Sequence, residues 1–279
     1  MDAMTDYTAA TEAPRHGTQS INAVAWQESW DRQQEAFMPD REQRFAAMLD
    51  AVAATTAGRP PRLLDLAGGT GTISLRTLAR FAGADVTVLD QDPVLLAIAD
   101  TSLRDRVTTA DTDLGDRGTI VDADLGDPGW RAKLPREGFD AVLTATALHW
   151  LPAERVAALY GEVREVLRPG GIFVNADHMP EEGLPTLSVK LRDHARGVRE
   201  ARYATGAATS WPDWWKLAAA DEFLAPKAIE RERIYPSARH NHEWTPPVAW
   251  HVEALRAAGY TEAGVLWRGG TDAAVVGTR

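Results

Sequence analysis

A glycine-rich turn is the segment of this sequence that most directly suggests chemistry. Residues 65–71 read Asp-Leu-Ala-Gly-Gly-Thr-Gly and begin at the end of the apolar run 63–66. Glycines let a backbone turn sharply and approach a ligand closely, and open α/β sheets bind ligands beyond the carboxyl ends of their strands. The turn therefore predicts the mouth of a nucleotide-type cofactor site. An ordinary tight turn is the alternative.

A carboxylate follows this turn at a meaningful distance. Asp90 ends the second apolar run, about 19 residues past Gly71, close to the spacing at which an acidic side chain accepts ribose hydroxyls. The alternative is a helix N-cap, a role that suits Asp92 better than Asp90. We therefore predict that Asp90 binds a ribose.

The spacing of the turn separates two cofactor classes. A nicotinamide dinucleotide needs G-x-G-x-x-G, with its pyrophosphate at the helix N-terminus. Here the spacing is Ala67-x-Gly69-x-Gly71, one residue tighter, and the carboxylate of Asp65 stands at the entrance. That charge is unfavourable beside a pyrophosphate and favourable beside an ammonium group. The site suits a nucleoside-bearing cofactor with an amino group, such as S-adenosylmethionine.

At this point the chain resembles a class I S-adenosylmethionine-dependent methyltransferase that acts on small molecules. The matching segments, in family order, are residues 64–71, 88–90, 123–125, 139–142, 147–151 and 167–171. The Ala-Leu-His-Trp stretch is similar to methyltransferases of small carboxylic acids or natural products. One departure is Ala67, where the family most often has glycine. A methyl group is tolerable there if the residue keeps a negative φ.

The resemblance implies a set of cofactor contacts. These are Asp65, Ala67, Gly69 and Gly71 for the methionine part, Asp90, Gln91, Asp124 and Leu125 for ribose and adenine, and Thr144 and His149 for the sulfonium. Asp122 competes with Asp124, because the match could slip by two residues.

Histidines are the candidate catalytic bases. His149 and His178 follow the fourth and fifth predicted strands, so both should lie at one edge of the sheet. An amine, hydroxyl or carbon acceptor can need a base within hydrogen-bond reach, although His149 can instead be a structural residue at a helix start. His240 and His242 alternate in a way that puts both imidazoles on one side of an extended segment. Without a further ligand cluster, loop hydrogen bonding is favoured over a metal, and no metal is predicted.

Aromatic residues gather in the segments expected to cover the acceptor. The predicted acceptor-binding residues are Trp30, Trp214, Trp215, His242 and Trp244. In the family that the chain resembles, these regions typically form a lid. Their rings suit a flat or apolar acceptor and a cationic sulfonium. Packing of the helical insertion onto the sheet is an equally weighted alternative.

The elements that must position these residues alternate between strands and helices. Strands are expected at 63–66, 86–89, 120–121, 140–144 and 172–174, and helices at 40–55, 72–81, from 93, 156–167 (stopped by 168–171) and from 246. This rhythm indicates a parallel sheet covered on both faces. Apolar runs around Gly269-Gly270 predict a closing hairpin. The expected fold is α/β and Rossmann-like, and the resemblance implies seven strands, the last antiparallel.

Four segments are expected. They are an N-terminal helical lid (1–59), a cofactor-binding core (60–177), a helical acceptor-cap insertion (178–244) and a core completion of one helix and the hairpin (245–279).

Composition excludes several function classes. The 279 residues carry a net charge of −10 and no cysteine. Disulfides, cysteine–zinc sites and thiol nucleophiles are therefore excluded, and the acidic balance disfavours nucleic acid and anionic membranes as partners. The apolar runs are too short to span a bilayer, and the first residues do not read as a signal peptide, so a cytoplasmic protein is expected.

The leading hypothesis is a small-molecule methyltransferase of secondary or acid metabolism. It would move a methyl group by in-line displacement, with or without a histidine base. The alternatives are a macromolecule methyltransferase, or a cofactor-binding scaffold with a non-methylating role as a cyclase or interaction module, which fold alone does not exclude. The oligomeric state stays open.

Overall fold

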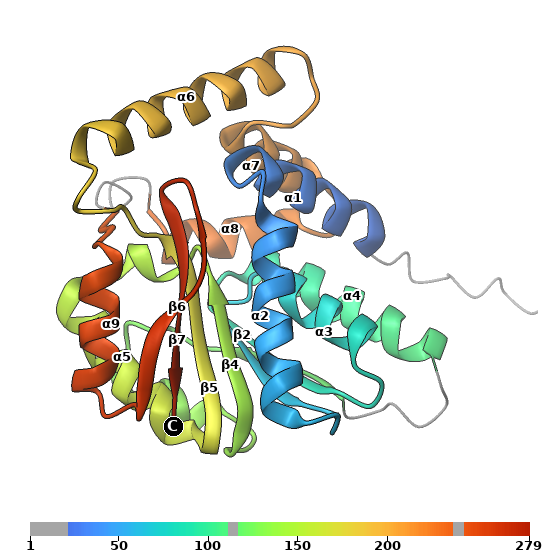
Figure 1. Ribbon diagram of the computed structural model, residues 1–279. Coiled ribbons are helices and arrows are strands. Elements are labelled where there is room, and N and C mark those ends of the chain that lie inside the picture. Colours follow the sequence, from blue (N-terminus) through green and yellow to red (C-terminus); the bar gives the residue numbers. More distant parts are fainter. Residues whose placement is uncertain (1–21, 111–116, 237–242) are drawn as a thin grey trace, which may run out of the picture.

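The computed structural model describes residues 22–110, 117–236 and 243–279. At its centre lies a seven-stranded sheet in the spatial order β3-β2-β1-β4-β5-β7-β6 (Figure 1). The strands are β1 (Arg62–Leu66), β2 (Asp85–Asp90), β3 (Gly118–Asp122), β4 (Phe139–Ala145), β5 (Leu167–His178), β6 (Glu262–Gly269) and β7 (Asp272–Thr278). Strands β1 to β5 run parallel, and β7 lies antiparallel between β5 and β6. The predicted Rossmann-like sheet with its closing hairpin is confirmed.

Helices cover both faces of this sheet. One face carries α2 (Arg41–Thr56), α3 (Thr72–Arg80) and α4 (Pro93–Ala110), and the other carries α5 (Ala153–Val166) and α9 (Val248–Ala257). Alternate residues of each central strand enter the two cores, as Leu63 and Leu64 of β1 illustrate. Strands that are buried on both faces have continuous apolar sequences, and for this reason they could be predicted from the sequence.

A helical layer lies over the carboxyl edge of the sheet, at the top of Figure 1. One member of this layer is α1 (Ala23–Phe37). The others are α6 (Pro185–Ala204), α7 (Trp211–Ala220) and α8 (Ala225–Ile234), and we call these three helices the cap. Phe45 and Met48 of α2 are buried against the sheet. The segment 1–59, which was expected to form a lid as a whole, therefore contributes to two parts of the structure. In its described part, α2 belongs to the core and α1 lies with the cap.

Tryptophans join α1 to the cap. Trp26, Trp30, Trp211, Trp214 and Trp215 form what we call the tryptophan cluster. Its central rings, those of Trp30 and Trp214, have centroids 4.9 Å apart. The Trp214 indole donates to Ser29 Oγ at 3.0 Å, and the cluster packs on Val94 and Ile98 of α4. Apolar burial and edge-on aromatic contacts therefore fix the cap to the core.

A buried ion pair adds a second attachment. Arg231 of α8 donates through Nε to Asp92 at 2.6 Å, and its guanidinium lies 3.5 Å from the centroid of the Trp215 ring. Asp92 also accepts from the backbone N–H of Val94 at 3.0 Å, so it caps α4. The Asp92 carboxylate thus links the start of a core helix to the cap.

The segment 168–171 follows the end of a helix as expected, since α5 ends at Val166, but it also belongs to the start of β5. The physical reason lies in Gly171, where a Cβ atom would stand 3.0 Å from the carbonyl oxygen of Phe139. Glycine is needed there for close approach of two strand backbones.

Within the described ranges, the helices are too short or too polar to cross a membrane.

Replacing Trp214, which is fully buried, by alanine is expected to lower the free energy of unfolding by about 3–5 kcal/mol. Chemical denaturation would measure this. The matched control is Leu217→Ala on the same helix, because Leu217 is 55% exposed, and its effect should stay within about 0.5 kcal/mol. Equal effects of the two substitutions would show that the cluster does not hold the cap.

Candidate active site

Asp65 lies one residue before the end of β1, and its carboxylate is fully buried. Its Oδ2 accepts from the Ser74 backbone N–H at 3.0 Å and from Ser74 Oγ at 2.9 Å. Its Oδ1 is buried and has no hydrogen-bond partner among the described residues. Burial raises the pKa of Asp65 to about 7. A buried carboxylate oxygen without a donor fits an ammonium group, which would satisfy the oxygen and lower this pKa.

The turn itself wraps around this carboxylate. Gly69 and Gly71 have φ values of +55° and +74°. A Cβ atom on Gly68 would lie 2.6 Å from Asp65 Cγ. Ala67 has φ +53°, so the condition of a negative φ, under which a methyl group is tolerable at this position, is not met. The tight turn forces the residue into the left-handed region, where a side chain carries strain.

Asp90 holds the same turn from β2. Its Oδ2 accepts from the Gly69 N–H at 2.8 Å, and its Oδ1 accepts from the N–H groups of Gln91 at 2.8 Å and Asp92 at 2.9 Å. Burial raises its pKa to about 6. Asp92, not Asp90, caps the helix, as the sequence indicated. Ribose binding by Asp90 stays a prediction, for which Oδ2, with Gly69 as its one donor in the described structure, has a further lone pair.

The residues predicted beside adenine lie near the end of β3. Asp122 pairs with Asp90 in the sheet register. Asp124 is exposed and accepts from the Gly126 N–H at 2.7 Å, and Leu125 is buried in the core. The structure brings all three to the edge of the sheet that carries Asp90. The choice between Asp122 and Asp124 stays a prediction.

Two further residues near the cofactor site were missed from the sequence. Arg41 of α2 is 4% exposed and binds Asp31 at 2.7 Å and Thr72 Oγ at 3.1 Å. It therefore stands at the start of α3, where a guanidinium and a helix N-terminus suit a carboxylate. Beside Asp90, the Tyr235 side chain hydrogen-bonds to Gln91, and burial and then Asp90 raise the pKa of Tyr235. Single charged or aromatic residues in helical segments gave no signal of these positions.

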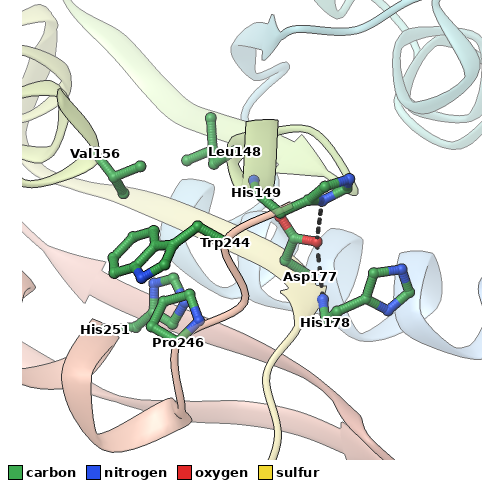
Figure 2. A pocket seen from close by; sticks show the side chains of 8 residues that line it. All are labelled: Leu148, His149, Val156, Asp177, His178, Trp244, Pro246 and His251. Atoms are coloured by element: carbon green, nitrogen blue, oxygen red, sulfur yellow. Dashed lines mark hydrogen bonds and ion pairs between the residues drawn. The ribbon is translucent and has the colours of Figure 1, made fainter. Parts of the chain in front are cut away.

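His149 lies in the turn Leu148–Trp150 that follows β4. Its Nδ1 is 2.8 Å from Oδ1 of Asp177, and its backbone N–H donates to Oδ2 at 3.3 Å (Figure 2). Burial opposes ionisation of Asp177, but the neighbouring His149 and then His178 hold its pKa below the usual value. An ionised carboxylate only accepts, so Nδ1 of His149 carries the proton and Nε2 is left as the basic atom.

His178 ends β5 and forms a second histidine–carboxylate pair. Its Nδ1 is 2.8 Å from Oδ1 of Asp272, whose Oδ2 binds the buried Arg44 at 2.5 Å. Burial opposes protonation of His178, but Asp272 and then Asp177 raise its pKa. The rings of His149 and His178 have centroids 5.6 Å apart. Two oriented imidazoles therefore lie together at the carboxyl edge of the sheet, as their positions in the sequence predicted.

The loop between β4 and His149 is strained. Thr146 has φ +52°, which is rare for a β-branched residue, and its N–H donates to the Ala176 carbonyl at 2.8 Å. The Thr144 hydroxyl is buried and has no partner in the described chain. Strain of this kind persists where surrounding contacts enforce it, often at functional sites.

The predicted acceptor residues separate into two places. Trp30, Trp214 and Trp215 lie in the tryptophan cluster, which favours the packing alternative for them. Trp244 lies beside the histidines, and its N–H donates to the His149 carbonyl at 2.9 Å. His242, like His240, falls outside the described residues. Acceptor contact by any of the five stays a prediction.

Comparison with known proteins agrees with this geometry. Residues 63–171 match the methyltransferase domain family. The ubiquinone/menaquinone biosynthesis C-methyltransferase UbiE of Methylobacterium nodulans is 35% identical over 117 residues, which are 42% of this chain. The chain thus covers 41% of the length of this curated relative.

Solved structures share the fold. Magnesium protoporphyrin IX methyltransferase (ChlM) from Synechocystis PCC 6803, solved with bound SAH, has a TM-score of 0.56 at 14% identity over 92% of this chain and 95% of that chain. An O-methyltransferase family protein from Burkholderia thailandensis has a TM-score of 0.52 at 19% identity over 92% and 71%. At such low identity these likenesses concern the fold alone.

The sheet order, the turn around Asp65 and the family match make residues 63–171 a class I methyltransferase domain. The cofactor of this class is S-adenosylmethionine, and the unpartnered Oδ1 of Asp65 fits its ammonium group.

The raised pKa of Asp65 predicts pH-dependent cofactor binding. In the free protein Asp65 holds a proton below pH 7, and an ammonium group must displace it. The Kd for S-adenosylhomocysteine should therefore fall roughly tenfold between pH 5.5 and pH 7, measured by calorimetry.

The control ligand is 5′-methylthioadenosine, which lacks the amino acid, so the pH dependence that it keeps comes from the ribose side, where burial raises the pKa of Asp90 to about 6. Asp65→Asn should reduce the pH dependence for S-adenosylhomocysteine to that of this control. If that variant keeps the dependence, another group is responsible.

The strain at Ala67 predicts that replacement by glycine, which usually destabilises a protein, stabilises this one. Ala67→Gly should raise the free energy of unfolding by about 0.5–1 kcal/mol, since glycine adopts a positive φ without strain. Ala97→Gly inside α4 should lower it by about 1 kcal/mol. Denaturant titrations of both variants compare them directly, and a loss of stability in both would show that Ala67 is unstrained.

Proposed function

We propose that this protein transfers the methyl group of S-adenosylmethionine to a small-molecule acceptor, with His149 or His178 as the base. The observation that carries the proposal is the pair of histidine–carboxylate contacts at the sheet edge that also carries the Asp65 turn. An imidazole held by a carboxylate is suited to proton removal, whereas contact with the sulfonium, which is also predicted for His149, does not need a basic nitrogen.

Different residues of the chain align the cofactor and remove the acceptor proton. The cofactor, when bound, supplies a methyl group already activated on a sulfonium. Asp65 and Asp90 hold its two ends and so align that group. Nε2 of His149 or His178 takes the acceptor proton, and Asp177 or Asp272 then stabilises the imidazolium that forms.

Two observations support a small acceptor with an ionisable hydroxyl or carbon. The net charge of −10 is unfavourable for nucleic acid. The relative from Methylobacterium nodulans is named a C-methyltransferase, and a carbon acceptor, like a hydroxyl, must lose a proton. Secondary metabolism and a cytoplasmic location are the proposed setting.

Alanine at either histidine tests the base. His149→Ala or His178→Ala should lower kcat by about 10²–10⁴-fold, while the Kd for S-adenosylhomocysteine changes little. Formation of S-adenosylhomocysteine with a panel of phenolic and enolic acceptors gives the rate. Unchanged rates in both variants would mean that alignment alone accounts for catalysis.

The pH profile of Asp272→Asn tells which histidine acts. Asp272 raises the pKa of His178, so its loss should lower that pKa. If His178 is the base, the acid limb of kcat/KM against pH shifts to lower pH, because the imidazole loses its proton earlier. If His149 is the base, the limb stays in place. Asp40, 3.3 Å from Arg44, remains as a partner for that buried cation in the variant.

A further inference from the structure

An open cavity lies at the amino edge of the sheet, opposite the edge that carries the candidate active site. Its volume is about 350 Å³, which is within the range of small-molecule sites. Arg62 begins β1 and Asp85 begins β2, and Asp140 and Arg168 are the second residues of β4 and β5. These four residues line the cavity together with Arg59, which lies in the connection between α2 and β1. The amino ends of four parallel strands therefore bring charged side chains to one place.

The carboxylate of Asp140 is shared by two of these arginines. Its Oδ1 accepts from Arg59 Nη2 at 2.9 Å and from Arg168 Nε. Its Oδ2 accepts from the Arg62 backbone N–H at 2.8 Å. Burial opposes ionisation of Asp140, but the hydrogen bonds from Arg62, Arg168 and Arg59 hold its pKa below the usual value. Asp140 is therefore one negative charge between two positive ones.

The carboxylate of Asp85 is shared in the same way. Its Oδ2 accepts from Arg136 Nη1 and lies 3.8 Å from Nε of Arg62, with which it forms an ion pair but no hydrogen bond. Four arginines thus face two aspartates, which leaves two positive charges at the wall of one cavity. The chain as a whole has a net charge of −10, so this excess is local. Like charges that are held together repel one another unless an anion compensates for them.

Two of the guanidinium groups keep unused donors. In the described structure, the side chain of Arg59 donates hydrogen bonds only through Nη2, and that of Arg62 only through Nη1. Both side chains are accessible, with exposed fractions of 59% and 43%. A planar guanidinium with free N–H groups binds phosphate oxygens in pairs. The free donors and the surplus charge therefore suit the same kind of ligand.

We propose that this cavity binds a phosphate dianion, either free or as the monoester of a small molecule, through hydrogen bonds from Arg59 and Arg62 and the charge of Arg168. A dianion balances both surplus positive charges, whereas a monoanion balances one. Pro60 adds an apolar part of the wall, against which the organic part of a monoester can pack. The cavity shares no residue with the candidate active site, so this inference goes beyond the proposed function and does not depend on it.

Two isosteric probes test the charge of the ligand. Phenyl phosphate is mostly a dianion at pH 8, and phenyl sulfate has the same shape with one negative charge. Their binding to the full chain is measured by calorimetry at low ionic strength, with S-adenosylhomocysteine present at saturation to keep the probes out of the cofactor site. We expect phenyl phosphate to bind about tenfold more tightly than phenyl sulfate. Equal affinities, or tighter binding of phenyl sulfate, would overturn the proposal.

Inorganic phosphate separates the two sources of the group. If it binds as tightly as phenyl phosphate, the proposal holds with the free ion as ligand. If phenyl phosphate binds more tightly, the proposal holds with a phosphorylated small molecule as ligand. Absence of binding by both compounds contradicts the proposal.

A substitution in the cavity provides an independent test. Arg59→Gln should weaken the binding of phenyl phosphate about tenfold, because it removes a charge and two free donor groups. The matched control is Arg196→Gln on α6, since the Arg196 side chain is also 59% exposed and also pairs with an aspartate, at 3.1 Å. This control should leave the affinity unchanged. Equal effects of the two substitutions would show that the cavity is not the binding site.

A second pair of variants leaves every arginine in place. Pro60 is exposed at the cavity, so Pro60→Glu adds a negative charge there without breaking an ion pair. Pro60→Gln has nearly the same shape and no charge. Only the glutamate should weaken the binding of phenyl phosphate, by about tenfold. If both variants bind equally well, the charge of this cavity does not select the ligand, and the proposal is wrong.

Discussion

The hydrogen bonds accepted by the carboxylate of Asp177 hold the two histidines of the candidate site in place. The carboxylate accepts from the ring and backbone of His149 and from the backbone of His178. These contacts tie the loop after β4 to the end of β5. A single buried charge therefore sets the tautomer of one imidazole and the position of both.

The cofactor side is organised in a similar way by carboxylates that bind backbone. Asp90 fixes the N–H of Gly69, and Ser74 occupies one oxygen of Asp65. The other oxygen of Asp65 is left for an ammonium group. This arrangement is locally unfavourable, because burial raises the pKa values of Asp65 and Asp90 and because Ala67 is strained. Strain and unpaired atoms thus concentrate where a ligand would compensate for them.

The cap is attached to the core by apolar burial and an ion pair, and not by carboxylates that bind backbone N–H groups. Its tryptophans bury apolar area against α4, and Arg231 reaches Asp92 at the start of the same helix. Helix α4 begins three residues after Asp90, so the cap is anchored next to the carboxylate that is predicted to bind the ribose. The histidine end instead adjoins the segment with Trp244. The tryptophans that pack the cap and the tryptophan beside the histidines are therefore different residues, which composition alone does not separate.

Local patterns of residues were enough to predict the strands, the glycine-rich turn and the edge of the sheet that carries the candidate site. Buried parallel strands are continuous apolar runs, and the carboxyl ends of parallel strands lie together whatever covers them. That is enough to place Asp65, Asp90, His149 and His178 at one edge.

Tertiary structure alone decided the partners. Asp272 meets His178 from 94 residues away, and Tyr160 meets His251 from 91. It also decided the left-handed conformation of Ala67 and the burial of Trp214. These features depend on how distant segments dock, and docking is a property of the packed core and cap that no local pattern of residues encodes.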